Sequence, residues 1–294
     1  MAGHARGMKA DISETAELIA LKHTVFALPF AVISLITAAD PGWPAPRVWF
    51  WVLVAMVSAR TAAMAFNRLA DHKFDAENPR TASRALPDGR LSRRFVWVVT
   101  VLSAAVFVIA AGMLNRFCLA LALPTLAILL GYSYAKRFTS VAHLWLGGSL
   151  GMAPIGAWVA ETGSLAWPPV VLGAAVTLWV AGFDVIYSLE DEDFDRGHGL
   201  HSLPAALGGS RALAVARLFH IAALIGFAAF AVMAGGGWLR FGAVIAAGAL
   251  LVWQHRLVSA DGLDAVDAAF FAANGILSVL MCSAFLFAKI LPAG

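Results

Sequence analysis

The sequence contains two acidic motifs, and each follows a long apolar stretch. The first is NRLADHKFD at residues 67–75, in which Asn67, Asp71 and Asp75 are spaced four residues apart. Residues four apart project from the same face of a helix, so the three side chains would form one stripe of oxygen ligands. Carboxylates at this spacing repel each other, and ionisable side chains near a membrane are costly and usually mark a functional site. The motif therefore predicts a bound cation.

The second motif is DVIYSLEDEDFD, which begins at Asp184. Asp184, Asp191 and Asp195 are separated by seven and four residues, so on a continuous helix they would again share one face. Several hard oxygen ligands suit Mg²⁺, which binds one or two carboxylates together with water and substrate phosphates. The alternative is that the acidic residues are solvated helix ends, and we favour it only for Glu192 and Asp193.

Basic side chains accompany both motifs. Lys136 ends the segment GYSYAK, with Tyr132 one turn before it, and Arg80 and Arg84 lie in the loop after the first motif. Arg60 precedes Asn67 by two helical turns and should point to the same side. These residues favour a diphosphate held through magnesium between cationic side chains. For Lys136 and Arg60 the alternative of topology signals or lipid-headgroup contacts stays open.

The elements that must position these residues are membrane-spanning helices. Of 294 residues, 61% are hydrophobic and 13% are charged, with a mean hydropathy of +0.79. Soluble domains have about 25% charged residues, so this composition excludes a soluble globular protein. We expect an all-α polytopic membrane protein with nine transmembrane segments of about 20 residues each. The predicted ranges are 18–39, 48–66, 95–114, 117–134, 143–160, 168–187, 212–233, 238–254 and 268–290.

The distribution of basic residues predicts the orientation. With nine spans, 16 of the 21 Lys and Arg residues fall on the face that also contains both acidic motifs, four fall on the other face, and Arg60 lies within a span. The positive-inside rule therefore places both motifs on the cytoplasmic side.

A faint internal repeat relates the two motifs. Asn67 and Asp184 are 117 residues apart, and so are Leu86 and Leu203, each of which precedes a proline. The offset equals four spans, which predicts a single domain with possible parallel halves of about 18–140 and 141–290. Parallel halves would bring the two acidic helix ends to one central cavity.

Together, these motifs resemble the UbiA superfamily of intramembrane aromatic prenyltransferases. The resemblance covers NRLADHKFD with RTASRALPDGRLS, DVIYSLEDEDFDRGHGLHSLP, GYSYAKRFT and KHTVFALPFA, which together cover most of the chain. It is closest to the 4-hydroxybenzoate polyprenyltransferase-like branch, which includes enzymes assigned to menaquinone synthesis. The resemblance implies nine transmembrane helices around a central cavity that opens sideways to lipid.

The resemblance also assigns roles to residues. It implies a metal site formed by Asn67, Asp71, Asp75, Asp184, Asp191 and Asp195. Asp71, Asp191 and Lys136 are the expected catalytic residues, and the expected substrate-binding residues are Asn67, Arg60, Tyr132, Arg84, Tyr187 and His23. The chain has His23-Thr24 where many 4-hydroxybenzoate enzymes have a basic residue followed by proline. His23 could pair with a benzoate carboxylate only when protonated, and a structural role fits it equally. We expect His143, His198 and His201 to be structural or loop residues.

The expected reaction is Mg²⁺-dependent transfer of a polyprenyl group from its diphosphate to an aromatic acid, with 4-hydroxybenzoate as the first choice of acceptor. A naphthoate or another superfamily acceptor is the alternative within the same class. We expect prenyl diphosphate, aromatic acid and membrane lipid as partners, and no nucleic acid. The expected location is the bacterial inner membrane, with the active site facing the cytoplasm. A cation-coupled transporter is the alternative from another class, but it would place its carboxylates near the bilayer midplane within inverted repeats.

Overall fold

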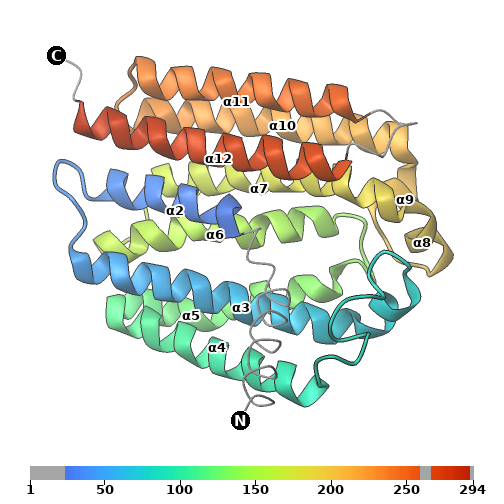
Figure 1. Ribbon diagram of the computed structural model, residues 1–294. Coiled ribbons are helices and arrows are strands. Elements are labelled where there is room, and N and C mark those ends of the chain that lie inside the picture. The colour runs from blue at the N-terminus through green and yellow to red at the C-terminus, as the bar shows by residue number, and fades with distance from the viewer. Residues whose placement is uncertain (1–23, 259–265, 292–294) are drawn as a thin grey trace, which may run out of the picture.

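The fold of the chain is a bundle of long helices (Figure 1). The computed structural model describes residues 24–258 and 266–291, and within those residues all regular structure is helical. The helices are α2 (Thr24–Ala38), α3 (Pro46–Glu77), α4 (Arg93–Leu114), α5 (Arg116–Ala135), α6 (Ala142–Thr162), α7 (Trp167–Tyr187), η2 (Ser188–Asp191), α8 (Glu192–Gly197), α9 (Leu203–Leu207), α10 (Gly209–Met233), α11 (Trp238–Leu257) and α12 (Val266–Ile290).

Each predicted span overlaps one of the long helices, so the prediction of a polytopic α-helical membrane protein is confirmed. In the described part of the chain, six helices are long and apolar enough to cross a membrane. The count of nine spans therefore stays a prediction. Residues 18–23 of the first predicted span lie outside the described residues.

Helix α3 differs most from its predicted range, because it continues to Glu77 instead of ending at residue 66. The added residues are mostly good helix formers such as Leu, Ala, Lys and Glu, and none is glycine or proline. The helix ends before Asn78, which precedes Pro79, where an α-helical conformation is disfavoured. At about 1.5 Å per residue, its 32 residues extend about 48 Å, whereas a bilayer core is about 30 Å thick. The first acidic motif lies on this additional length of helix.

Helix α7 forms the centre of the bundle, between α6 and α10 (Figure 1). In its most apolar window 61% of the residues are buried, compared with 22% to 33% in the other candidate spans. Its Trp179 packs against Phe26 and Phe30 of α2 and against Phe183. The second acidic motif therefore begins on a helix whose position is fixed on several sides.

Glycines bring α6 and α7 into close contact. A Cβ atom added to Gly147 would lie 2.2 Å from the carbonyl oxygen of Thr177, and one added to Gly151 would lie 2.4 Å from the carbonyl oxygen of Gly173. Small residues allow membrane helices to approach closely and to gain van der Waals contact. This packing sets the distance between α6 and the second acidic motif on α7.

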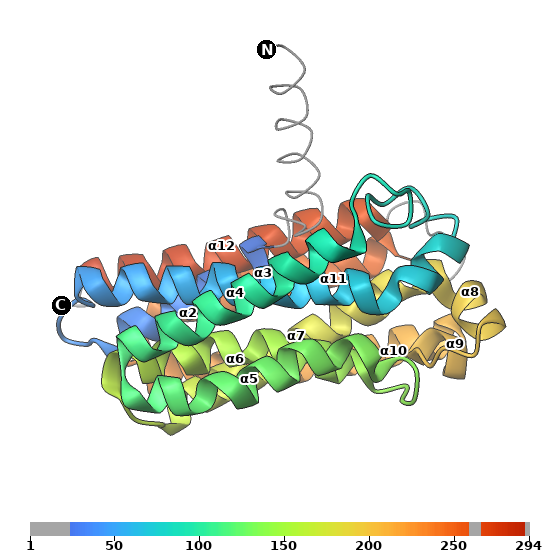
Figure 2. The same cartoon turned by 90° about the horizontal axis from the view of Figure 1, so that it is seen from below.

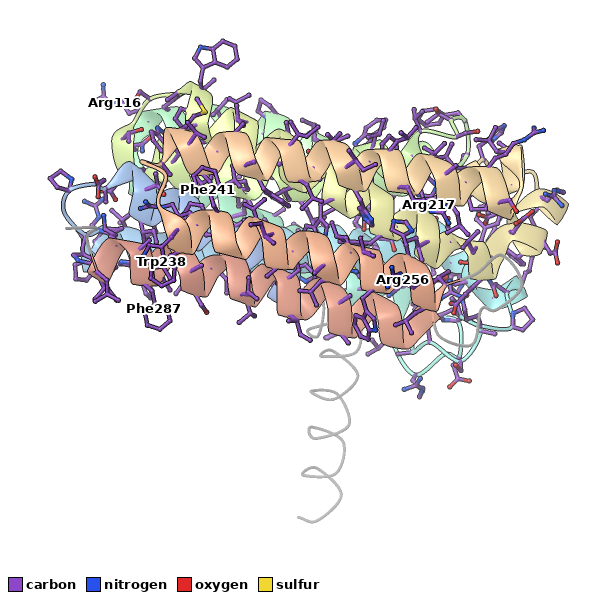
Figure 3. All side chains as sticks on the ribbon, turned by 90° about the horizontal axis from the view of Figure 1, so that it is seen from above. Arg116, Arg217, Trp238, Phe241, Arg256 and Phe287 are labelled. Atoms are coloured by element: carbon purple, nitrogen blue, oxygen red, sulfur yellow. The ribbon has the colours of Figure 1, made fainter. Side chains whose placement is uncertain are left out.

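The two ends of the bundle differ in character. Helix α8 and the loop after α3 lie at the same end (Figures 1 and 2). Arg217 and Arg256 lie toward that end, while Arg116 and the exposed aromatic residues Trp238 and Phe287 lie at the opposite end (Figure 3). Exposed aromatic rings are typical of a membrane interface. The basic residues labelled in Figure 3 are thus distributed between the two ends as the span prediction requires.

Candidate active site

The first acidic motif lies on the last turns of α3, with its polar side chains in mutual contact. The amide of Asn67 donates a hydrogen bond of 2.8 Å to Asp71 Oδ2. Asp71 Oδ1 lies 3.4 Å from Arg137 Nη2, which reaches across from the end of α5. Arg84 of the following loop donates a 2.7 Å hydrogen bond to Asp75 Oδ1. The predicted stripe therefore exists, and a separate arginine accompanies each of its two carboxylates.

The second motif is not one continuous α-helix, which differs from the expectation. Helix α7 ends at Tyr187, the 3₁₀ turn η2 covers Ser188–Asp191, and α8 follows. A 3₁₀ turn is wound more tightly than an α-helix, so regular α-helical spacing does not hold across it. Asp184, Asp191 and Asp195 nevertheless line the same cavity. The bend at η2, and not a straight helical stripe, brings these three carboxylates to one cavity.

Asp191 is held from the loop that follows α3. Its Oδ1 accepts hydrogen bonds from Asn78 Nδ2 at 2.9 Å and from Arg80 Nε at 3.0 Å, and Arg80 Nη2 bonds its Oδ2. Arg80 Nη1 also donates to the hydroxyl of Tyr187 at 2.7 Å, and the guanidinium lies over the Tyr187 ring. Through Asp191, the end of the first motif's helix is joined directly to the second motif.

Lys136 at the end of α5 approaches the last carboxylate of the second motif. Its Nζ lies 3.5 Å from Asp195 Oδ2, and its carbonyl oxygen accepts a hydrogen bond from the backbone N–H of His201. Burial lowers the pKa of Lys136, but the charges of Asp195, Asp184 and other nearby carboxylates outweigh it and raise the pKa above its usual value. Lys136 is therefore a permanent cation within the acidic site.

His143, at the start of α6, is fully buried and contacts Asp184. Its Nδ1 lies 2.6 Å from Asp184 Oδ2, and its Nε2 accepts a 3.2 Å hydrogen bond from the backbone N–H of Leu203. A ring nitrogen that accepts a hydrogen bond is unprotonated, so Nδ1 carries the proton and donates it to the carboxylate. His143 was expected to be a structural or loop residue, and its contact places it where it can orient a predicted metal ligand.

The polar side chains meet in one cavity of about 220 Å³. It is lined by residues of both motifs and by residues from α5 and the loop after α3. Among the predicted site residues, the lining includes Asn67, Asp71, Asp75, Arg84, Tyr132, Lys136, Asp184, Tyr187, Asp191 and Asp195. The cavity thus combines a set of carboxylates with a set of cations from different parts of the chain.

Two predicted substrate-binding residues do not belong to this lining. Arg60 lies on α3 seven residues before Asn67 and is half-buried near Tyr132. It is therefore located deeper along the helix than the cavity itself. His23 lies outside the described residues.

Arg80 was expected among the cations of the site, but its pairing with Asp191 was not, nor were Asn78 and the orienting role of His143. Asn78 stands three residues after the first motif, and the polar run NPRT was its only sequence signal. The partner of Asn78 and Arg80, Asp191, is more than 100 residues away along the chain. His143 stands at the start of a predicted span, and no local pattern indicates that it faces Asp184.

The sequence pattern of the UbiA prenyltransferase family matches residues 27–276 of this chain. Two curated relatives are the 4-hydroxybenzoate octaprenyltransferases of Citrobacter koseri and Salmonella newport. They are 30% identical over 246 residues and 31% identical over 253 residues, and in both cases the match covers 82% of this chain and 83% of the relative.

Solved structures have the same fold. A UbiA homologue from Aeropyrum pernix aligns with a TM-score of 0.82 and 35% identity, covering 92% of this chain and 98% of the other. A UbiA homologue from Archaeoglobus fulgidus, solved with DMAPP and Mg²⁺, aligns with a TM-score of 0.74 and 17% identity, covering 94% and 99%. The second likeness concerns the fold alone. The long apolar helices, the family match and the curated relatives together identify this chain as an integral membrane enzyme of the UbiA prenyltransferase family.

Proposed function

We propose that this enzyme transfers a polyprenyl group from its diphosphate to 4-hydroxybenzoate, in quinone biosynthesis. The observation that carries this proposal is the single cavity in which two acidic motifs meet Lys136, Arg80 and Arg84. Carboxylates suit a divalent metal ion, and the surrounding cations suit the diphosphate oxygens. The names of the curated relatives support 4-hydroxybenzoate as the acceptor.

Mg²⁺ is the proposed cofactor, and the residues present fit it. Oδ2 of Asp75 and Oδ2 of Asp195 are buried and accept no hydrogen bond from the described residues, so each can take a ligand. No group of three or more His, Cys, Asp or Glu side chains is arranged for a metal within the described ranges. Mg²⁺ does not need such a cage, because it commonly combines one or two carboxylates with water and substrate phosphates. The Archaeoglobus fulgidus homologue was solved with Mg²⁺ and a prenyl diphosphate, which supports the same choice.

The proposed ligands are the six motif residues, Asn67, Asp71, Asp75, Asp184, Asp191 and Asp195. When bound, the metal would supply Lewis-acid stabilisation of the negative charge on the leaving diphosphate. Lys136 and Arg84 would bind diphosphate oxygens, and their fixed charges would stabilise the same leaving group. Tyr132 and Tyr187 line the walls between these charged groups.

The chemical change is substitution at an aromatic carbon. The allylic C–O bond of the prenyl diphosphate breaks, and diphosphate leaves with the electron pair. The ring carbon beside the phenolic hydroxyl forms the new C–C bond, and the ring then loses one proton to restore aromaticity. Exclusion of water from the cavity would protect the allylic cation from hydrolysis.

Arg60 is the proposed partner for the acceptor's carboxylate. It lies about two turns deeper on α3 than Asn67, beside Tyr132, so an aromatic acid bound there would lie next to the diphosphate site. A guanidinium can bind a carboxylate through two parallel hydrogen bonds. His23, which the sequence comparison with 4-hydroxybenzoate enzymes indicates, is the second candidate for this contact.

We also propose that the cavity faces the cytoplasm across the bacterial inner membrane. The bacterial origin of the curated relatives supports that membrane. The excess of Lys and Arg on the face with the acidic motifs supports the orientation. The prenyl chain would extend sideways into lipid. We also propose that the chain consists of two parallel halves, about 18–140 and 141–290. This would explain why both acidic motifs lie at the end of a long apolar helix.

The test is a direct transfer assay with purified protein. The protein is incubated with Mg²⁺, a prenyl diphosphate and a panel of hydroxylated benzoic and naphthoic acids, and products are identified by mass spectrometry. We expect prenylated 4-hydroxybenzoate, formed only when the metal is present. Asp71→Ala and Asp191→Ala should abolish transfer while the protein still inserts into membranes.

Three outcomes would contradict the proposal. Transfer by either alanine variant at the wild-type rate would show that the replaced aspartate is not a metal ligand. Prenylation of a naphthoate and not of 4-hydroxybenzoate would contradict the proposed acceptor. Undiminished transfer after chelation with EDTA would exclude the divalent cofactor.

A further inference from the structure

Arg80 occupies the coordinating oxygens of Asp191. Both oxygens of this carboxylate are engaged, Oδ1 by Asn78 and Arg80 Nε and Oδ2 by Arg80 Nη2. Arg80 Nε also lies 4.0 Å from Glu190 Oε2. A metal ion that used Asp191 as a ligand would meet a guanidinium on the same oxygens. The guanidinium therefore opposes a metal ion at Asp191, through its charge and through the hydrogen bonds that it makes to both oxygens.

Two other paired carboxylates, those of Asp75 and Asp195, are more open. Asp75 accepts a hydrogen bond from Arg84 at Oδ1, but its Oδ2 accepts none from the described residues, and Arg68 lies 3.8 Å from it. Asp195 Oδ2 likewise accepts none from these residues, although Lys136 Nζ lies 3.5 Å away. Either carboxylate could bind a metal through this oxygen without losing a hydrogen bond. Asp191 differs because both of its oxygens already accept hydrogen bonds, and a guanidinium bonds each of them.

The position of Arg80 indicates what would draw it away. Its side chain is 31% exposed, whereas that of Asp191 is 10% exposed, so the guanidinium lies on the accessible side of the pair. Both residues line the cavity in which the diphosphate is proposed to bind. Burial lowers the pKa of Arg80, but the hydrogen bond to Asp191 and the charge of Asp191 outweigh it and raise the pKa above its usual value. The side chain therefore stays charged. A diphosphate entering the cavity would offer this guanidinium a bidentate partner of higher charge than one carboxylate.

We infer that Arg80 makes the second acidic motif selective for a metal that arrives with diphosphate over a free metal ion. Without diphosphate, Arg80 remains on Asp191 and opposes metal binding there. With diphosphate, Arg80 transfers to phosphate oxygens, and Asp191 becomes available to the metal. The inference rests on the proposed function, because it uses the same metal ligand and the same diphosphate.

Direct binding measurements on the full-length protein in detergent test this exchange. Mn²⁺ serves as a paramagnetic probe, and the bound fraction is measured by electron paramagnetic resonance with and without a short prenyl diphosphate. For Arg80→Gln, we expect the affinity for Mn²⁺ alone to rise about tenfold, or about 1.4 kcal/mol. The affinity for the prenyl diphosphate in the presence of Mn²⁺ should fall by a similar factor, because the variant loses a cation that binds it.

Arg84→Gln is the matched control, because it removes the same charge from the same loop and cavity. Since Asp75 already has an oxygen without a hydrogen bond, its gain in free Mn²⁺ affinity should be less than about threefold. Arg80→Lys keeps the charge but loses the two-point contact, so its affinities should lie between those of the wild type and Arg80→Gln.

The results separate the two ideas. An unchanged or lower free-metal affinity for Arg80→Gln would overturn the inference while leaving the proposed function intact. Equal gains for Arg80→Gln and Arg84→Gln would also overturn it, because general charge removal would then explain the effect. A wild-type protein whose prenyl diphosphate binding does not respond to Mn²⁺ would overturn the proposed metal dependence and the inference with it.

Discussion

The contact between His143 and Asp184 gives the most detailed prediction about the site. His143 is fully buried, donates from Nδ1 to the Asp184 carboxylate and accepts from the Leu203 backbone at Nε2. Replacement by alanine removes both bonds and leaves a cavity. We expect His143→Ala to bind the metal and prenyl diphosphate together less tightly, because Asp184 would lose the group that orients it.

The expected magnitude follows from these contacts. A hydrogen bond to a charged group contributes about 1.5–3 kcal/mol. If all of this free energy serves to orient Asp184, the affinity would fall by about tenfold to about a hundredfold, since 1.4 kcal/mol corresponds to a factor of ten. Loss of the bond from Leu203 should lower stability by about another 1 kcal/mol without changing ligand affinity directly.

Two conservative variants separate these effects. In His143→Asn the amide nitrogen can donate in place of Nδ1, whereas in His143→Gln the amide oxygen can accept in place of Nε2. We therefore expect His143→Asn to keep ligand affinity within about threefold of the wild type, and His143→Gln to resemble His143→Ala. Affinity is measured by calorimetry with Mg²⁺ and a prenyl diphosphate, and stability by thermal unfolding in detergent.

The reasoning would be refuted by ligand affinities that do not distinguish the asparagine and glutamine variants. It would also be refuted if His143→Ala were less stable but bound ligand as tightly as the wild type. In either case His143 would support only the fold, and Asp184 would not depend on it for its orientation.

Two further predictions concern charge and packing. Lys136→Glu should raise the KM for prenyl diphosphate at least tenfold or abolish transfer, because it places a negative charge beside Asp195; an unchanged KM in a steady-state assay would make Lys136 only a topology signal. Gly151→Ala should lower stability by about 1–3 kcal/mol, because its Cβ would lie 2.3 Å from Thr177 Oγ1. Gly148→Ala, with no atom within 4 Å of the added Cβ, is its control, and equal thermal midpoints for the two variants would contradict the close packing of α6 and α7.

The sequence predicted the helices well because their signals are local. Long apolar runs indicate membrane spans through hydropathy alone, and each predicted range overlaps a helix in the described residues. The errors arose at the acidic motifs. Helix α3 continued through the first motif because its residues favour a helix, although they are polar. The second motif bent at η2, where regular spacing could not reveal the turn.

Sequence alone was enough to assign the class of protein and the aspartates of the cavity, because composition and helical spacing are properties of short segments. The partner of each carboxylate became known only from the packed helices. Asp191 meets Arg80 from 111 residues away, and Asp184 meets His143 from 41 residues away. These contacts depend on how closely the helices pack, for example at Gly151, and on where the loop after α3 closes over α7. Such distances result from the packing of the whole chain, so no local pattern of residues contains them.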